Sequence, residues 1–441
     1  MNRQILRLAI PNIISNLTVP LLSSVDTALM GHLENVAYLG AIAIGGMIFN
    51  FIYWGFGFLR MGTTGLAAQA FGKEDEESSM LILARAIAVA LGFSLILIAI
   101  QKPIALFSFS LVDATKEVEH FAHQYFSIRI FAAPATLTLY AFTGWFLGMQ
   151  NAKYPLIIAV ITNLLNIIFN VIFIRIYGMD VDGVALGTVC ANYLGLAVAM
   201  ILFLRCYRRH IIWFDLHRVI QTDALKKFFS LNFDIFIRTL ILIFAFAFFT
   251  AQAAAAGELV LAANTILINL WTIVSYGIDG FAFAGESLTG RFFGAGDRRQ
   301  LTKVIRYMFI WGTGLGVAFT ILFYLYDKEI MYIFTDKPDV IGLALTMMPW
   351  TMAAPVINSF CYIWDGVFIG ATASKAMRNA MIICLLIFYL PAYYATLPFL
   401  GNHALWLSLT VFMLARGISL HIYYPSQILA RIPTRSLAIE V

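Results

Sequence analysis

The chain of 441 residues is 61% apolar, carries only 12% charged residues and has a net charge of +5. A soluble domain has about 25% charged residues, so this composition excludes an ordinary water-soluble protein and indicates a chain embedded in lipid. The basic residues lie in short segments between apolar runs, which is typical of membrane topology and argues against nucleic-acid binding.

Twelve apolar segments are long enough to cross a bilayer, because a spanning helix needs about 20 residues. Lipid offers the backbone no hydrogen-bond partners, so we expect each span to be an α-helix. The composition therefore predicts an all-α polytopic membrane protein with twelve transmembrane helices. We place them at 6–30, 37–68, 80–104, 120–148, 155–177, 183–206, 228–253, 260–290, 302–326, 340–370, 378–399 and 403–428.

The two halves of the chain repeat each other at an offset of 222 positions. Identical pairs include Leu39/Leu261, Gly55/Gly277, Gly72/Gly294, Gly144/Gly366 and Lys153/Lys375. An even number of spans in each half makes the repeats parallel. We expect an N-terminal six-helix lobe at 1–206, a linker at 207–227 and a C-terminal six-helix lobe at 228–441. Such repeats are typical of secondary transporters.

Loop charges predict the orientation. With twelve spans, one side of the membrane collects 20 Lys and Arg residues and the other only 5. The positive-inside rule then places both termini in the cytoplasm.

The first apolar stretch lacks a cleavage pattern and is expected to be retained as a span. The four cysteines lack metal-ligand spacing and are expected to be apolar fillers.

Asp26 lies deep in the first span, in PLLSSVDTALMG, with no basic residue within one turn. A charged side chain at mid-membrane costs about 2.5–3.5 kcal/mol, so its presence needs a reason. Apolar surroundings favour the protonated carboxyl group. Asp26 is therefore a candidate proton acceptor or cation ligand, and the alternative is a structural hydrogen bond to a neighbouring helix.

Three amides lie on one face of the fifth span, at Asn163, Asn166 and Asn170 in TNLLNIIFN. They are expected to face protein or a wet cavity, with Thr188 of the sixth span as a possible neighbour. Their role stays open between ligating a cation and joining helices by hydrogen bonds, which is common for Asn in membranes.

The second half carries its own charges within spans. Asp234 and Arg238 have the spacing of an internal ion pair, Glu286 is near the end of its span beside Arg291, and Asp365 lies in CYIWDGVFIGA. Asp279 and three further arginines, Arg60, Arg129 and Arg416, need partners that the sequence does not identify.

Several aromatic and Met side chains are candidates for an adaptable substrate cavity, although packing or lipid contact is the simpler explanation for each of them alone. The candidates are Met47, Tyr53, Met61, Tyr276 and Trp364, together with Trp54, Trp145 and Met149.

Four stretches make the chain resemble the multidrug and toxic compound extrusion family, in its branch named after the bacterial DNA-damage-inducible protein F. They are IPNIISNLTVPLLSSVDTALMGHL (10–33), FLRMGTTGLAAQAFG (58–72), YGIDGFAFAGESLTGRFFGAGD (276–297) and CYIWDGVFIGATASKAMRNAM (361–381). The resemblance implies a cation-coupled exporter in a bacterial inner membrane, with two six-helix lobes around a central cleft.

The resemblance also implies site residues. Asp26 matches the family's ion-binding aspartate, and Asn166 and Thr188 match its partners, but Asn170 stands where relatives carry a second carboxylate. We therefore expect protons, rather than sodium, to drive export of organic, often cationic or amphipathic compounds. Asp365 is carried over on its local match. We expect a monomer without cofactor, resident metal or nucleic-acid partner.

Two other functions remain as alternatives. A lipid or lipid-linked sugar flippase of the same superfamily would be expected to carry a strongly basic cavity, and the four mid-span arginines lie among acidic residues. An intramembrane aspartyl protease using Asp26 and Asp365 would need a Gly-x-Gly-Asp motif, which YGIDGF does not supply.

Overall fold

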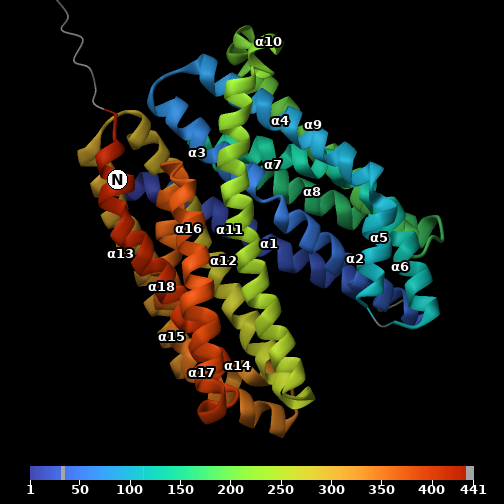
Figure 1. Ribbon diagram of the computed structural model, residues 1–441. Coiled ribbons are helices and arrows are strands. Elements are labelled where there is room, and N and C mark those ends of the chain that lie inside the picture. The colour runs from blue at the N-terminus through green and yellow to red at the C-terminus, as the bar shows by residue number, and fades with distance from the viewer. Residues whose placement is uncertain (31–34, 113, 434–441) are drawn as a thin grey trace, which may run out of the picture. The chain divides into compact units, whose positions relative to one another are not determined.

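The computed structural model describes residues 1–30, 35–112 and 114–433, without the side chains of residues 19–30 and 36. These residues form helices joined by short connections, and no strand occurs among them (Figure 1). The α-helices are α1 (Asn2–Met30), α2 (Val36–Gly55), α3 (Phe58–Gly72), α4 (Glu76–Ala99), α5 (Gln101–Ser110), α6 (Lys116–Arg129), α7 (Ala133–Gly148), α8 (Lys153–Val171), α9 (Val181–Cys206), α10 (Leu216–Val219), α11 (Thr222–Ala255), α12 (Glu258–Gly294), α13 (Arg298–Leu325), α14 (Asp327–Phe334), α15 (Pro338–Gly370), α16 (Ser374–Ile383), α17 (Leu390–Leu400) and α18 (His403–Gln427).

The membrane-spanning segments agree with the sequence prediction. Within the described residues, 11 helical segments are long and apolar enough to cross a membrane, and α1 covers the remaining predicted span. The all-α polytopic class is confirmed. Two predicted spans are interrupted: the second is divided into α2, which ends at Gly55, and α3, which begins at Phe58, and the third is interrupted where α4 ends at Ala99 and α5 begins at Gln101. Pro103 has no N–H to donate to the Ala99 carbonyl, so a continuous helix is disfavoured there.

The repeat is visible in backbone geometry as well as in sequence. Asp75 caps α4 by accepting from the Ser78 N–H, and Asp297 caps α13 by accepting from the Gln300 N–H, 222 positions later. The left-handed residues Gln150 (φ 62°) and Thr372 (φ 54°) are related by the same offset. Equivalent turns and caps therefore recur in both halves, as expected for two copies of one six-helix unit.

Close helix packing also recurs at this offset. A Cβ atom on Gly144 would lie 2.4 Å from the Arg60 carbonyl oxygen, and one on Gly366 would lie 2.3 Å from that of Ala282. Gly92 and Gly314 form another pair at the same offset, but a Cβ on either would meet nothing within 4 Å. The first pair is therefore required for close approach of two helices, and the second is not.

We expect Gly144→Ala and Gly366→Ala each to destabilise the protein by about 1–3 kcal/mol, because the new methyl group pushes two backbones apart. Gly92→Ala and Gly314→Ala serve as matched controls and should leave stability unchanged or slightly raised. The thermal unfolding midpoint of the purified protein in detergent measures this. Equal midpoints for the two sets of variants would contradict the packing argument.

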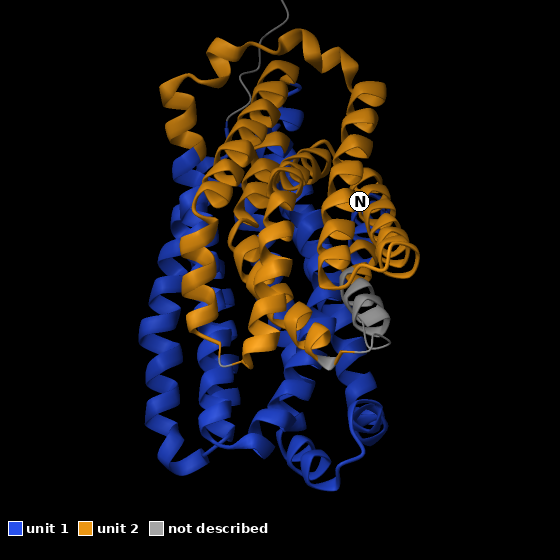
Figure 2. Ribbon diagram, turned by 90° about the vertical axis from the view of Figure 1, so that its right-hand side faces the viewer, with its two compact units in different colours: residues 1–13, 68–74, 229–441 blue, residues 14–67, 75–228 orange. Residues whose placement is uncertain are grey.

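Backbone contacts divide the chain into two compact units (Figure 2). Unit 1 comprises residues 1–13, 68–74 and 229–441, and unit 2 comprises 14–67 and 75–228. The start of α1 and the end of α3 thus join the second half of the chain. Within unit 1, the Gln69 side chain donates to the Gly370 carbonyl at 3.0 Å and to Thr372 Oγ1 at 3.0 Å.

The core of unit 1 is built from large aromatic and aliphatic side chains of α11, α12, α15 and α18. Phe249 packs edge-on against Trp406 at a centroid distance of 5.0 Å, and Trp271 lies 6.2 Å from the same ring. The Asn264 Oδ1 atom accepts from the indole N–H of Trp406 at 2.9 Å. A buried polar atom is thereby satisfied inside an apolar core.

The connection between α9 and α11 is folded onto unit 2. Arg85 of α4 donates through Nη2 to the Arg218 carbonyl at 2.8 Å and through Nε to the Val219 carbonyl at 3.2 Å. The Val219 side chain is buried against Leu81 and Ala84 of α4. A basic residue within a span is thereby explained, because Arg85 satisfies carbonyls at the end of α10.

His210, a residue of this connection, is buried against unit 2, with 1% of its surface exposed. Its ring meets those of Trp145 and Tyr207 edge-on, each at 5.7 Å. Neither ring nitrogen has a hydrogen-bond partner in the described part of the chain. Burial lowers the pKa of His210 from its ordinary value, against the smaller opposing effect of Glu76 and with a small lowering contribution from Arg209.

We expect acidification to loosen this connection. The folded state holds His210 neutral, so the stabilisation is fully present above the ordinary pKa of about 6.5 and is lost as pH falls below it. Hydrogen-exchange protection factors for residues 207–221 should therefore decrease between roughly pH 7.5 and pH 5.5. His210→Phe should remove that pH dependence, and an unchanged profile in this variant would contradict the assignment.

Candidate functional site

A cluster of amide and hydroxyl groups joins α8 to α9 inside unit 2. Asn170 Nδ2 donates to Asn166 Oδ1 at 3.1 Å, and Asn166 Nδ2 donates to Thr188 Oγ1 at 3.0 Å. Thr188 in turn donates to the Val184 carbonyl at 3.0 Å. Asn166 and Asn170 are buried, with 3% and 0% exposure. The predicted contact between Thr188 and the asparagines is therefore present.

The third amide of this face contacts α1. Asn163 Nδ2 donates to Thr18 Oγ1 at 3.0 Å. All three asparagines of α8 therefore point toward neighbouring helices, as their spacing predicts. We call Asn163, Asn166, Asn170 and Thr188 the amide cluster.

Local backbone features accommodate the amide cluster. A Cβ atom on Gly187 of α9 would lie 2.2 Å from Asn170 Oδ1 of α8. Only glycine at position 187 therefore leaves room for the Asn170 amide. Directly after Asn170 and Val171, residues 172–176 form a π-helical turn. Such turns interrupt the regular ladder and are frequent at functional sites.

The side chain of Asp26 lies outside the described residues, but its backbone belongs to α1. Asp26 follows Thr18 by eight residues, or about 12 Å along a helix. Asn170 follows Asn163 by seven residues, or about 10 Å. The first and fifth spans run in the same direction, and Thr18 contacts Asn163. Counted along the two helices from this contact, the backbones of Asp26 and Asn170 lie at similar distances.

A second polar cluster lies inside unit 1, where Asp365 of α15 binds two arginines. Its Oδ2 atom accepts from Arg416 Nη2 of α18 at 2.6 Å and also from Arg238 Nη2 of α11. All three side chains are at most 8% exposed. The Arg416 guanidinium also lies over the Phe412 ring, 5.4 Å from its centroid. We call Arg238, Asp365 and Arg416 the arginine–aspartate triad.

The predicted ion pair between Asp234 and Arg238 is wrong. Asp234 instead accepts from Arg378 Nη1 at 2.5 Å and from Ser374 Oγ at 2.8 Å, both on α16. The two residues are one turn apart on α11, but each has a partner on another helix. Arg378 was missed as a site residue because it is the first residue of the predicted eleventh span and was counted among the charges at the membrane boundary.

Other predicted residues are placed individually. Glu286 on α12 is buried, with 2% exposure. Arg129 donates to Tyr125 Oη at 2.6 Å and lies 4.9 Å from the centroid of the Phe49 ring. The sequence did not identify a partner for Arg129, and the cation–π contact with Phe49 is one of its partners.

The cavity candidates are divided between the units. Met47, Tyr53 and Met61 belong to unit 2, whereas Tyr276 and Trp364 belong to unit 1. Met47 is 44% exposed, whereas Trp364 is 2% exposed, and the Trp364 ring packs against that of Tyr424 at 4.9 Å. Packing therefore accounts for Trp364, and the substrate role of these five residues stays a prediction.

Comparison with known proteins gives the family. The MatE family model matches residues 11–172 and 235–394, one segment in each half of the repeat. The chain belongs to the MatE family. DNA damage-inducible protein F of Escherichia coli (strain K12) is 36% identical over 94% of this chain and 90% of its own length. The probable multidrug resistance protein NorM of Thermotoga maritima is 22% identical over 78% and 74%, respectively.

Solved structures agree with the MatE fold. A MATE protein in a bent conformation superposes with a TM-score of 0.88 at 20% identity, covering 98% of this chain and 96% of the other. A MOP superfamily transporter from Pyrococcus furiosus, described as having a binding pocket of reversed polarity, gives 0.87 at 19% identity, with 98% and 96% coverage. As a MatE protein, the chain is a multi-pass membrane transporter and not an enzyme.

Proposed function

We propose that this MatE transporter is a proton-coupled antiporter of the bacterial inner membrane that exports organic, often cationic or amphipathic compounds. Both termini lie in the cytoplasm in this proposal. A proton from outside binds Asp26 and changes the arrangement of α1 against α8. The exported compound binds the other state of the transporter and is released when the proton binds. Proton and compound must stabilise different states, since a ligand that binds both equally shifts neither.

The amide cluster supports protons over sodium. A sodium site needs several oxygen ligands around a carboxylate, and two of the oxygens in this cluster already accept hydrogen bonds, Asn166 Oδ1 from Asn170 and Thr188 Oγ1 from Asn166. Asn170 contributes an amide where relatives carry a carboxylate. A single carboxyl group that takes up a proton needs no such ligand shell. This hydrogen-bonded arrangement beside α1 is the observation on which the proposal rests.

The arginine–aspartate triad favours coupling at Asp26 over coupling at Asp365. The Oδ2 atom of Asp365 already accepts from guanidinium groups of two other helices, which gives this carboxylate a structural role. Asp234 is similarly engaged by Arg378. Asp234 and Asp365 therefore both have structural partners, which supports Asp26 as the residue that binds the proton.

Efflux from proteoliposomes under separate gradients tests the proposal. The protein is reconstituted with a fluorescent organic cation or a bile-salt-like amphiphile, and either a proton or a sodium gradient is imposed. We expect substrate movement with the proton gradient and none with sodium alone. Transport driven only by sodium would contradict the argument from Asn170, and a protonophore provides the control for the proton gradient.

A further inference from the structure

The connection between α9 and α11 exposes an unusual number of large apolar side chains. They follow one another on and around α10, and their exposed fractions are 76% for Ile212, 42% for Trp213, 50% for Phe214, 63% for Leu216 and 57% for Ile220. The connection is packed onto unit 2, because two of its own residues, His210 and Val219, are buried. A contiguous exposed apolar surface of this kind marks an interaction with membrane or protein.

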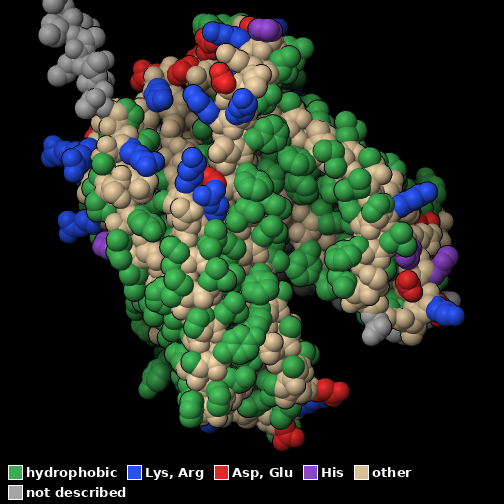
Figure 3. Space-filling model, in the orientation of Figure 1, with side chains coloured by type: hydrophobic (Ala, Val, Ile, Leu, Met, Phe, Trp, Pro, Cys, Tyr) green, Lys and Arg blue, Asp and Glu red, His purple; other side chains and the backbone are tan. Residues whose placement is uncertain are grey.

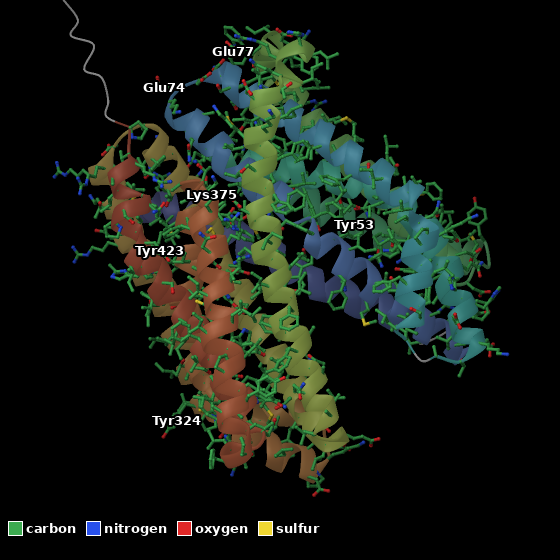
Figure 4. All side chains as sticks on the ribbon, in the orientation of Figure 1. Tyr53, Glu74, Glu77, Tyr324, Lys375 and Tyr423 are labelled. Atoms are coloured by element: carbon green, nitrogen blue, oxygen red, sulfur yellow. The ribbon has the colours of Figure 1, made fainter. Side chains whose placement is uncertain are left out.

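The position of α10 along α4 indicates a membrane surface. Arg85, which donates to the carbonyls of Arg218 and Val219, lies nine residues into α4. That is about 13 Å from the first residue of the helix. The connection therefore lies along the flank of a spanning helix rather than beyond its end. Figure 4 shows Glu77, at the start of α4, beside the α10 end of unit 2.

Charge on the same surface is basic. Arg209 is paired with Glu76 at 2.9 Å and Arg218 is paired with Glu77. Arg208, Lys226 and Lys227 are exposed and have no ion pair within the part of the chain that the structure describes. In the space-filling view, Lys and Arg side chains lie at this end of unit 2 together with Asp and Glu side chains (Figure 3). These three cations are therefore available to an anionic partner.

The exposed apolar residues of α14 lack this basic charge. On α14, Tyr332 and Ile333 are 66% and 78% exposed, but the helix carries Asp327 and Glu329 against one lysine, Lys328. The combination of exposed apolar side chains with unpaired basic groups thus distinguishes the α9–α11 connection from α14. Ile333 is a control for Ile212 because the two side chains are nearly equally exposed.

We propose that residues 205–227 form an interfacial binding surface for anionic phospholipid. Arg208, Lys226 and Lys227 contact headgroup phosphates, while Ile212, Trp213 and Leu216 enter the boundary between headgroups and acyl chains. Tryptophan favours that boundary, and apolar insertion together with basic residues is how amphipathic segments bind membranes. Because α11 connects this surface to unit 1, lipid binding holds the connection between the two halves of the transporter at the membrane.

A fluorophore at position 212 tests the proposal in the full-length protein. Ile212→Cys is labelled in a chain carrying Cys206→Ser and reconstituted into nanodiscs of phosphatidylcholine with or without phosphatidylglycerol. Brominated acyl chains report insertion and aqueous acrylamide reports exposure to water. We expect phosphatidylglycerol to raise quenching by brominated lipid and to lower quenching by acrylamide. A label at Ile333→Cys should show no dependence on phosphatidylglycerol.

Charge variants separate lipid binding from simple proximity to the bilayer. Each neutralised Lys or Arg should weaken the response to phosphatidylglycerol about fivefold, so the combined variant R208Q/K226Q/K227Q should lose it. Inorganic phosphate added in place of phosphatidylglycerol should have no effect. Acrylamide access at position 212 that is the same in detergent and in anionic nanodiscs would overturn the proposal, as would a full lipid response in the combined variant. Hydrogen exchange of residues 211–221 in the unlabelled protein gives the same readout without a dye.

Discussion

Replacing Asp365 by asparagine is expected to destabilise the protein by about 3–5 kcal/mol, because breaking a buried ion pair leaves an uncompensated charge. In the arginine–aspartate triad, this substitution removes the counter-charge of two cations at once. Arg238 and Arg416 are 7% and 1% exposed, and their Nε atoms have no acceptor among the described residues. The neutral amide introduced by Asp365→Asn would leave both guanidinium groups without a counter-charge. Unfolding by denaturant in mixed micelles measures the loss.

Asp234→Asn is the matched control for this variant. Its partner Arg378 has a side chain that is 30% exposed, so the cation left behind can hydrate and the cost is expected to be smaller. Equal destabilisation by the two substitutions would contradict the importance of burial. Replacing all of the triad with apolar residues, in R238M/D365L/R416M, should restore much of the stability lost in Asp365→Asn.

The apolar replacement also separates structure from coupling. If the triad only joins α11, α15 and α18, the stable apolar variant should retain proton-driven transport. Loss of proton-driven transport in a variant of normal stability would instead assign Asp365 to coupling and would contradict the proposed role of Asp26. The same protein preparation thus answers both questions.

Local patterns were sufficient to predict the spans and the repeat. Apolar length defines a membrane helix, so the span bounds need no knowledge of tertiary contacts. The common face of Asn163, Asn166 and Asn170 also follows from helical periodicity alone. The identity of Gly144 and Gly366 predicted a repeat, and the structure adds the physical reason, since each glycine meets a carbonyl oxygen on a helix of its own half.

Ion-pair partners could not be predicted in this way. Asp234 and Arg238 have a spacing that permits a local pair, but their partners lie more than 100 positions away, on α15 and α16. Charged side chains in a membrane interior select the partner that gives the best geometry and burial, and helix packing decides which that is. The interruption between α4 and α5 was missed for a different reason, since hydropathy does not register the N–H that Pro103 lacks.

Asp26→Asn is expected to abolish proton-driven export while the protein still folds and inserts. Asparagine resembles the protonated aspartic acid in size and charge, so the state that normally follows proton binding becomes permanent. Proton binding can then no longer shift the equilibrium between the two states, and a gradient performs no work on the substrate. Proteoliposome efflux under an imposed proton gradient measures the loss, and size-exclusion profiles establish that the variant is folded.

Asp26→Glu keeps a titratable carboxyl group at nearly the same place and should retain part of the proton-driven transport, which distinguishes proton binding from a structural hydrogen bond. If asparagine and glutamate behave alike, the carboxyl group acts only as a hydrogen-bond partner of a neighbouring helix. Full proton-driven efflux in Asp26→Asn would remove the residue from the mechanism. Because the amide cluster contains only neutral side chains, coupling would then have to involve another carboxylate of the chain, and the apolar triad variant would test whether it is Asp365.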